Sequence, residues 1–420
     1  MSMYKAEPTN QGRATGLAAT WNTLPLIIGF FWLVSAILAL QAQTFTVMHA
    51  FTGKGDGASP YTAVTLDHLG NLYGTAGSGG AFQRGTVFKI SAQGTESILY
   101  SFWGGDGMQP SGPPIPDEKG DFYSSTTEGG TPEGGGCIYG CGTVFKLNKS
   151  HKESVLYAFT GKADGSAPDG SLVRDRAGNL YGTAFQGGAY GWGVIFKLDK
   201  NNHETVLHAF TGSSDGSGAS AGLIRDKSGN LYGVAYGGIY QGGVVFKVNT
   251  AGQFTVLHSF TGGSDGGPPS GTLLRDAAGS LYGVAGGGNS SACHGGCGVV
   301  FRLDPSGKES VLYTFRGSPD GAYPGGSLVR DKSGNFYGIT TAGGSGNCPQ
   351  DGNGCGTVFK LDASGHETVL HNFTGGNDGF YPWAGLTIDD SANLYGTTSQ
   401  GGDLSCGGGN GCGVVFKLTP

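Results

Sequence analysis

Short apolar segments alternate with clusters of glycine, aspartate and asparagine from residue 44 to residue 418. Each apolar segment is five to seven residues long and is rich in valine, phenylalanine, tyrosine and threonine. These side chains favour pleated strands, whereas glycine, aspartate and asparagine favour tight turns. The pattern therefore predicts an all-β fold made of short antiparallel strands.

Four landmarks recur seven times in one order along the chain. They are a V-L-H-x-F-T-G-x-x-D-G segment, an apolar segment ending in aspartate, a G-N-L-Y-G segment and a G-[TV]-[VI]-F-[KR] segment. The phenylalanines of the first landmark are Phe51, Phe102, Phe159, Phe210, Phe260, Phe315 and Phe373. Four short strands in a unit of about 50 residues are typical of a β-propeller blade, whereas the coils of an open β-solenoid, the main alternative, are usually shorter.

The order of the segments at the two ends favours the propeller. Residues 44–51 match the fourth strand of a unit, and residues 413–418 match a third strand that lacks its fourth. In a closed ring the N-terminal strand would complete the last blade and remove both open edges. We therefore predict a seven-bladed β-propeller of four-stranded antiparallel blades over residues 43–420.

The N-terminus has the pattern of an export signal. Lys5 and Arg13 precede residues 24–40, which are uncharged and strongly apolar, and the small residue Ala42 follows. This order predicts a signal peptide over residues 1–42 that is cleaved after Ala42. An uncleaved membrane anchor is the alternative, because 17 apolar residues are at the lower limit for crossing a bilayer.

Composition excludes several other classes of protein. Glycine supplies 84 of the 420 residues, which disfavours a helical bundle, and no G-X-Y period indicates collagen. The 18 tyrosines and 23 phenylalanines argue against disorder. A net charge of −6 argues against nucleic acid as the main partner, which would need a concentrated basic face.

All eight cysteines fall in local pairs between the third and fourth landmarks, where the connection is long. We predict the disulfides Cys137–Cys141, Cys293–Cys297, Cys348–Cys355 and Cys406–Cys412, which an exported chain can keep. Metal binding by Cys293, His294 and Cys297 is the alternative. A zinc site usually needs four ligands, so we expect neither a metal nor another cofactor.

The G-[TV]-V-F-K-L and L-Y-G-T-x-x-x-G-G repeats resemble those of the GloVer tandem-repeat ("choice-of-anchor") proteins of bacterial surfaces. The resemblance covers residues 44–420 and implies export, a repeat-built β fold and a biochemical role that is not defined. The D-x-x-G-N-L-Y core has a shorter resemblance to the repeats of NHL and lactonase-like propellers.

Polar residues that recur in every unit are expected to be structural, because a binding or catalytic site belongs to one place in a ring. They include the aspartate of each D-G pair, which we expect to bond its own turn. The arginines that end the second landmark in four units are expected to pair with aspartates of their own blades, and a basic arc toward one mouth of the ring is the alternative. They are Arg174, Arg225, Arg275 and Arg330.

Departures from the repeat are better candidates for a binding site. Trp103, Phe380, Tyr381 and Trp383 are unusual aromatic residues in connections that we expect to share one face with the cysteine loops. Exposed tryptophan and tyrosine suit contacts with a sugar or a protein. The alternative is that these rings pack under their own loops.

These features favour a non-catalytic binding scaffold for carbohydrate or another surface protein. We expect a monomer that is secreted, periplasmic or held at the cell surface, with membrane contact only through an uncleaved N-terminal segment. No catalytic residue is assigned, because no G-x-S-x-G, H-E-x-x-H or P-loop motif occurs. The alternative is a lactonase- or polysaccharide-lyase-type enzyme with its site at the ring mouth.

Overall fold

The computed structural model describes residues 43–130, 136–346, 348 and 354–420. The predicted signal peptide, residues 1–42, lies outside the described residues and stays a prediction. Within the described ranges, no helix is long and apolar enough to cross a membrane.

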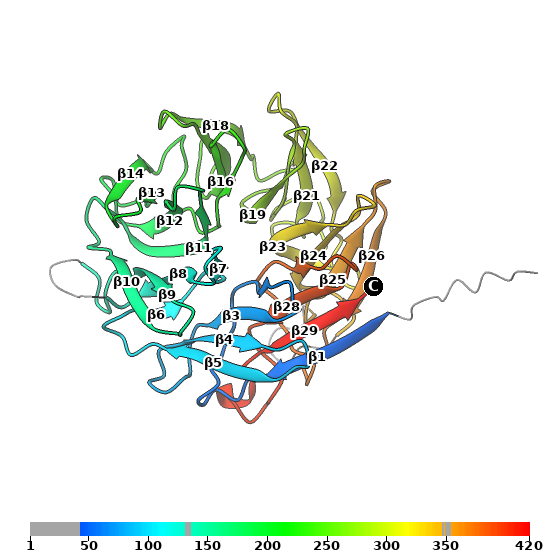
Figure 1. Ribbon diagram of the computed structural model, residues 1–420. Helices are drawn as coiled ribbons and strands as arrows, with labels where there is room; N and C mark the ends of the chain where they lie inside the picture. Colours follow the sequence, from blue (N-terminus) through cyan, green and yellow to red (C-terminus); the bar gives the residue numbers. More distant parts are fainter. Residues whose placement is uncertain (1–42, 131–135, 347, 349–353) are drawn as a thin grey trace, which may run out of the picture. The chain divides into compact units, whose positions relative to one another are not determined.

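Seven antiparallel sheets form a ring over the described residues, and each sheet is one blade (Figure 1). Blade 1 contains β2 (Thr65–Leu66), β3 (Leu72–Ala76), β4 (Thr86–Ile90) and β5 (Glu96–Ser101). Blade 2 contains β6 (Met108–Pro110), β7 (Ile115–Pro116), β8 (Phe122–Glu128), β9 (Thr143–Leu147) and β10 (Glu153–Ala158). Blade 3 contains β11 (Ser166–Arg174), β12 (Leu180–Gln186), β13 (Val194–Leu198) and β14 (Glu204–Ala209).

The remaining blades continue the ring in chain order. Blade 4 contains β15 (Ile224–Arg225), β16 (Leu231–Ala235), β17 (Val244–Val248) and β18 (Phe254–Ser259). Blade 5 contains β19 (Pro269–Arg275), β20 (Leu281–Ala285), β21 (Val299–Leu303) and β22 (Glu309–Thr314). Blade 6 contains β23 (Ala322–Arg330), β24 (Phe336–Ala342), β25 (Thr357–Leu361) and β26 (Glu367–Asn372). Blade 7 contains β27 (Thr387–Ile388), β28 (Leu394–Thr398), β29 (Val414–Thr419) and β1 (Thr44–Ala50).

The N-terminal strand closes the ring, as the sequence predicts. Strand β1 pairs antiparallel with β29, and Thr44 lies opposite Thr419 (Figure 1). The Phe51 amide extends this pairing by donating a hydrogen bond to the Gly413 carbonyl at 3.0 Å. The fold class is confirmed: the described chain is an all-β, seven-bladed propeller whose last blade is completed by its first strand.

The core lies between neighbouring blades. The phenylalanine that follows each outermost strand is buried and meets, at an angle, the phenylalanine of the third strand in the next blade. The seven pairs are Phe51–Phe88, Phe102–Phe145, Phe159–Phe196, Phe210–Phe246, Phe260–Phe301, Phe315–Phe359 and Phe373–Phe416. Their centroids are 5.0–5.7 Å apart, within the range that favours edge-to-face contact.

The glycine of the L-Y-G landmark makes room for this aromatic pair. A Cβ atom at Gly182 would lie 2.6 Å from the ring of Phe196, which is too close for a side chain. Blade 2 has Ser124 at this position, and its hydroxyl donates to the Gly112 carbonyl at 2.7 Å. A small residue is therefore required wherever the strand passes beneath the ring.

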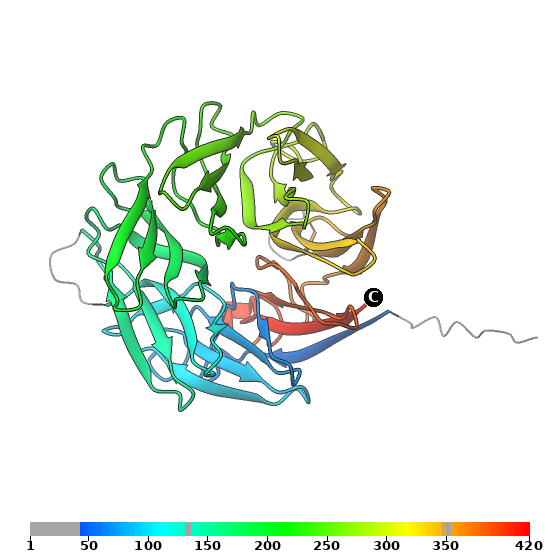
Figure 2. The same cartoon turned by 45° about the horizontal axis from the view of Figure 1, so that its top comes forward.

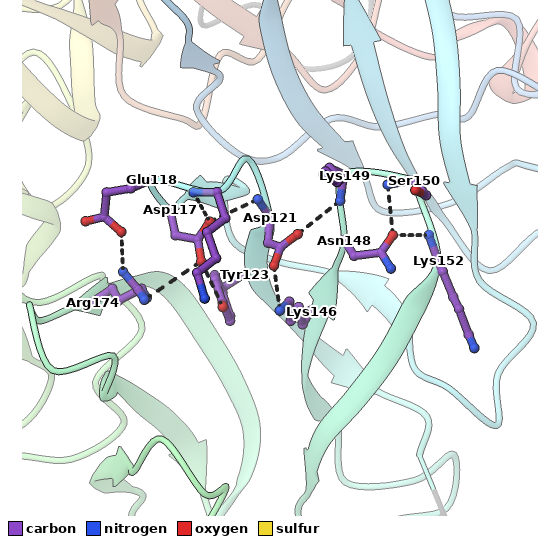
Figure 3. A network of polar contacts seen from close by, with 11 residues as sticks. Asp117, Glu118, Asp121, Tyr123, Lys146, Asn148, Lys149, Ser150, Lys152 and Arg174 are labelled. Carbon is purple, nitrogen blue, oxygen red and sulfur yellow. Dashed lines mark hydrogen bonds and ion pairs between the residues drawn. The ribbon is translucent and has the colours of Figure 1, made fainter.

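The turns between the first and second strands contribute to contacts between neighbouring blades, as blades 2 and 3 show (Figure 3). In blade 2, Asp117 accepts a hydrogen bond from the Tyr123 hydroxyl at 3.2 Å. Arg174 of blade 3 reaches this turn, 3.8 Å from the Asp117 carboxylate and 3.3 Å from that of Glu118. The prediction that Arg174 pairs within its own blade was therefore wrong.

The other three recurrent arginines also reach backwards, because each guanidinium lies over a tyrosine of the preceding blade. These contacts are Arg225 over Tyr181, Arg275 over Tyr232 and Arg330 over Tyr282. Such stacked cations contribute to stability, particularly where water is partly excluded. The recurrent arginines therefore contribute to contacts between neighbouring blades.

Removing β1 tests the closure. An internal deletion of residues 44–50 would leave β29 with an unpaired edge, which favours association with another chain. We expect the melting temperature to fall by more than about 5 °C and the variant to self-associate, as measured by calorimetry and by size-exclusion chromatography with light scattering. A monomeric variant with an unchanged melting temperature would contradict the closure.

Candidate functional site

A cavity of about 590 Å³ lies at the centre of the propeller. The innermost strands of the blades face this centre (Figure 2). All seven blades line the cavity with residues of the loop that enters the blade or of its first strand, and five blades add a residue at the end of the second strand. Its size is that of an ordinary small-molecule site.

One position per blade shows how the cavity departs from the repeat. This position lies five residues after the aspartate of each D-G pair. It is occupied, from blade 1 to blade 7, by Tyr61, Ser111, Asp169, Ser220, Ser270, Gly325 and Trp383, and all seven residues line the cavity. Three blades therefore present a hydroxyl and one presents only backbone, whereas blades 1, 3 and 7 present side chains of different chemistry.

Three of the four aromatic side chains that line the cavity belong to the consecutive blades 6, 7 and 1, and the fourth, Tyr236, belongs to blade 4. Trp383 of blade 7 and Tyr61 of blade 1 belong to neighbouring blades, and their side chains are 57% and 53% exposed. Tyr323 of blade 6 adds a third ring beside them. The Tyr61 ring lies over Gly77, where a Cβ atom would be 3.0 Å from it. This sector offers a ligand several uncovered aromatic surfaces.

The loops that carry these residues are held in an unusual backbone conformation. Two positions before each cavity residue, a residue other than glycine has a positive φ in five blades. They are Ser59, Gln109, Ala167, Tyr323 and Tyr381, with φ values of 51–54°. This left-handed conformation costs free energy for residues with a Cβ atom, so the surrounding structure must hold it.

Hydrogen bonds to the preceding blade hold these loops. The amide of Tyr323 donates to the Cys297 carbonyl at 2.8 Å, and that of Ser59 donates to the Cys412 carbonyl at 2.8 Å. Ala167 makes the same contact with Cys141 at 2.9 Å. The Tyr381 amide donates to the Cys355 carbonyl at 3.3 Å, so in four of these five blades the second cysteine of a predicted disulfide positions the rim of the cavity.

The four predicted disulfides are confirmed. Their Cα–Cα distances are 5.3 Å for Cys137–Cys141, 5.1 Å for Cys293–Cys297, 5.1 Å for Cys348–Cys355 and 5.6 Å for Cys406–Cys412. These values lie in the ordinary disulfide range. Residues 347 and 349–353 of the third loop lie outside the described residues.

Blade 3 has no cysteine and uses a tryptophan in the same place. A Cβ atom at Gly161 would lie 2.7 Å from the Cys141 sulfur, and a Cβ atom at the corresponding Gly212 would lie 2.5 Å from the Trp192 indole nitrogen. The Trp192 carbonyl also accepts a hydrogen bond from the Gly218 amide at 2.8 Å. Disulfide and indole therefore support the next blade's loop in equivalent ways.

Asp169 is the one formally charged side chain among the described residues that line the cavity. Its Oδ1 atom accepts a hydrogen bond from the Gly170 amide at 2.8 Å. Burial raises its pKa to about 6, and within the described part of the chain no cation lies close enough to oppose this shift. A carboxylate held in this way binds a proton more readily than an ordinary aspartate does.

The structure separates the four aromatic candidates. Trp383 lines the cavity, whereas Tyr381 is half-buried against the core of blades 6 and 7. Phe380 is 1% exposed in that core, which leaves it no surface to offer a ligand. Trp103 is 59% exposed but does not line the cavity, and its ring covers Gly105 of its own loop.

Sequence reasoning missed Asp169, Tyr61 and Tyr323. A signal for two of them was present, since an alignment of the seven units on the D-G pair shows Tyr61 and Asp169 where other blades have serine or glycine. The same alignment shows Tyr323 as an aromatic residue two positions before Gly325. Elsewhere in the described ranges, no group of three or more His, Cys, Asp or Glu residues is arranged to hold a metal ion.

Comparison with known proteins identifies a family. The family model described as "Gloeobacter/Verrucomicrobia repeat" matches residues 131–352, which is just over half of the chain. No curated protein matches this sequence.

Solved structures share the architecture at low sequence identity. Virginiamycin B lyase from Staphylococcus aureus is 11% identical, with a TM-score of 0.57 over 90% of this chain and 99% of that chain. Hydrazine synthase from Kuenenia stuttgartiensis is 11% identical, with a TM-score of 0.53 over 82% and 94%. A gluconolactonase from Xanthomonas campestris, 13% identical, has a TM-score of 0.43 over 86% and 96%. At these identities the first two show the fold alone.

The energetic cost of Asp169 is testable. Because its folded pKa of about 6 lies above the ordinary value of 3.8, the carboxylate destabilises the fold above pH 6 and has no such effect below pH 4. We expect Asp169→Asn to raise the free energy of unfolding by roughly 1–2 kcal/mol at pH 8. The gain should shrink between pH 6 and pH 4, as measured by chemical denaturation of both proteins. An equal gain at pH 4 and pH 8 would mean that the charge is not its cause.

Proposed function

The chain belongs to the Gloeobacter/Verrucomicrobia repeat family, and from this fold and its central cavity we propose that it is an exported, non-catalytic propeller that binds carbohydrate. The family match supports the repeat architecture only. The ligand class follows from the side chains that line the cavity.

The observation that carries the proposal is where the departures from the repeat occur. The residues shared by all blades build turns and inter-blade contacts, whereas Tyr61, Asp169 and Trp383 break the pattern at one equivalent position and line one cavity. Nothing in the packing of the blades requires them, because Ser111, Ser220 and Ser270 serve in other blades. Different side chains converging on a single cavity are expected of a binding site.

The chemistry of these groups suits a sugar. The apolar C–H face of a sugar ring can lie against an aromatic ring such as that of Trp383 or Tyr61. Its hydroxyl groups can exchange hydrogen bonds with the serines of the cavity and with the Asp169 carboxylate. A cavity of about 590 Å³ has room for a short oligosaccharide.

The proposed location outside the cytoplasm rests on the cysteines. The four disulfides indicate an oxidising environment, in which such bonds persist. Together with the export signal predicted over residues 1–42, they support a secreted, periplasmic or surface-held protein.

An enzyme of the lactonase or polysaccharide-lyase type is the second candidate. The observation that favours it is Asp169, because a carboxyl group with a pKa near 6 can exchange protons near neutral pH. The described cavity lining contains no other carboxylate and no histidine, so the phenols of Tyr61, Tyr236 and Tyr323 are the other side chains there that can exchange protons. Release of product from a bound oligosaccharide, lost in Asp169→Asn, would favour the enzyme over the binding protein.

Replacing Trp383 tests the binding site. A glycan array followed by calorimetry would identify and measure a bound oligosaccharide. We expect Trp383→Ala to weaken that binding about tenfold, because the change removes an aromatic contact surface. The melting temperature should stay within about 2 °C of the parent value, because the side chain is 57% exposed.

Trp103→Ala is the matched control, since Trp103 is 59% exposed and lies outside the cavity lining. It should leave the affinity unchanged. The proposal would be contradicted if Trp383→Ala lowered the melting temperature without changing the affinity. Equal losses of affinity in both variants would also contradict the central site.

A further inference from the structure

Resting on the proposed function, we propose that the sugar held in the central cavity carries a protonated amine and that Asp169 is its counter-charge. The inference starts from the charge of the cavity. Among the described lining residues, one aspartate stands against no lysine, arginine or histidine. An anionic ligand would meet repulsion there, whereas a cationic ligand would neutralise a carboxylate that the protein leaves unpaired.

The hydrogen bonds of Asp169 leave room for such a group. Its Oδ1 atom accepts the Gly170 amide, and Oδ2 has no hydrogen-bond donor among the described residues. Asp175, by contrast, accepts bonds from the Asn179 side chain at 2.8 Å and the Tyr181 hydroxyl at 3.1 Å, in addition to backbone amides. An aspartate in a turn of this fold therefore accepts several hydrogen bonds from the protein, whereas the carboxylate of Asp169 in the cavity accepts one.

The repeat shows that the fold does not need this carboxylate. Blades 2, 4 and 5 have serine at the equivalent position, and blade 6 has glycine. Burial raises the pKa of Asp169 to about 6, so the charge is held at a cost to stability near neutral pH. An unpaired charge at a site that tolerates serine is best explained by a ligand that supplies the missing partner.

The aromatic sector complements the carboxylate. In a ring of seven blades, blade 3 with Asp169 lies across the centre from blades 6 and 7, which carry Tyr323 and Trp383 (Figure 1). A sugar ring that stacks on this sector can direct a substituent toward blade 3. The aromatic faces themselves also attract a cation, which further favours an amine over a neutral substituent.

The test compares two probes that differ in charge. They are an oligosaccharide of glucosamine and its fully N-acetylated counterpart of equal length, each titrated by calorimetry at about pH 6.5, where the amine and the Asp169 carboxylate both carry charge. We expect the parent protein to bind the amine form at least tenfold more tightly. Asp169→Asn keeps the shape and the acceptor for the Gly170 amide but removes the charge. It should reduce this preference to less than about twofold, because the amine probe should lose much more affinity than the acetylated probe.

Asp390→Asn is the matched control. It makes the same chemical change at a side chain that is 97% exposed and outside the cavity lining, so the preference should persist. Lowering the pH below 6 should weaken amine binding to the parent protein, because protonation of Asp169 removes the counter-charge while the glucosamine amines, which titrate near neutral pH, are by then fully charged. The other titratable groups lining the described cavity are the phenols of Tyr61, Tyr236 and Tyr323. Asp169→Asn should lack this pH dependence.

The outcomes separate the two proposals. Equal affinity of the parent protein for both probes would overturn the inference about the amine and leave a carbohydrate-binding protein standing. A preference that persists in Asp169→Asn would also overturn it, because the counter-charge would then lie elsewhere. Failure of the parent protein to bind any glycan on the array would overturn the proposed function and the inference together.

Discussion

The propeller depends on one contact, the meeting of two phenylalanine rings between successive blades. Phe159 and Phe196 are both nearly free of solvent, with centroids 5.1 Å apart, and the same pair recurs at every boundary in the ring. The contact requires a small residue below it, which explains why phenylalanine and glycine repeat together. Because the cohesion lies in the second, third and outermost strands, the innermost strand can be short, and β2, β15 and β27 have two residues each. Cavity residues can therefore change without disturbing the blades.

The disulfides act on the cavity through the backbone. Each closes a loop on the same face as the mouth, and the carbonyl of its second cysteine is available to the loop that enters the next blade. Tyr323 and Tyr381 receive this contact from Cys297 and Cys355, at 2.8 and 3.3 Å. A positive φ at a bulky residue persists only when its surroundings hold it. Rigid loops also lose less conformational entropy when a ligand binds, so the covalent links support preorganisation as well as stability.

The repeats made the fold and its closure predictable, because each landmark reports a local requirement that recurs seven times. The site was harder to predict. Phe380, Tyr381 and Trp383 are all aromatic and lie close together in the sequence. Phe380 is nevertheless in the core, Tyr381 is half-buried and Trp383 lines the cavity. Simple alternation of a strand does not give this result, because the left-handed backbone at Tyr381 breaks the alternation. Asp169 was missed because one aspartate among many has no motif, and its environment is created by seven strands meeting at the centre.

Two kinds of incompletely bonded carboxylate in this protein show why position matters more than residue type. Five glutamates that begin outermost strands also have raised pKa values, because burial and the aspartate of the preceding blade disfavour their charge. Glu96, for example, has a pKa of about 7 and lies near Asp56. Their recurrence assigns them to the blade boundary, where a neutral glutamic acid is compatible with the packing. In blades 4 and 7 the same position is filled by Phe254 and Phe45, each of which stacks on a histidine of the preceding blade. The position thus selects for a neutral or apolar group.

Asp169 occurs once, beside no acidic neighbour, and opens onto a cavity instead of a blade boundary. A perturbed pKa that repeats with the fold is a property of the fold, whereas that of Asp169 breaks the repeat inside the cavity in which we propose that a ligand binds.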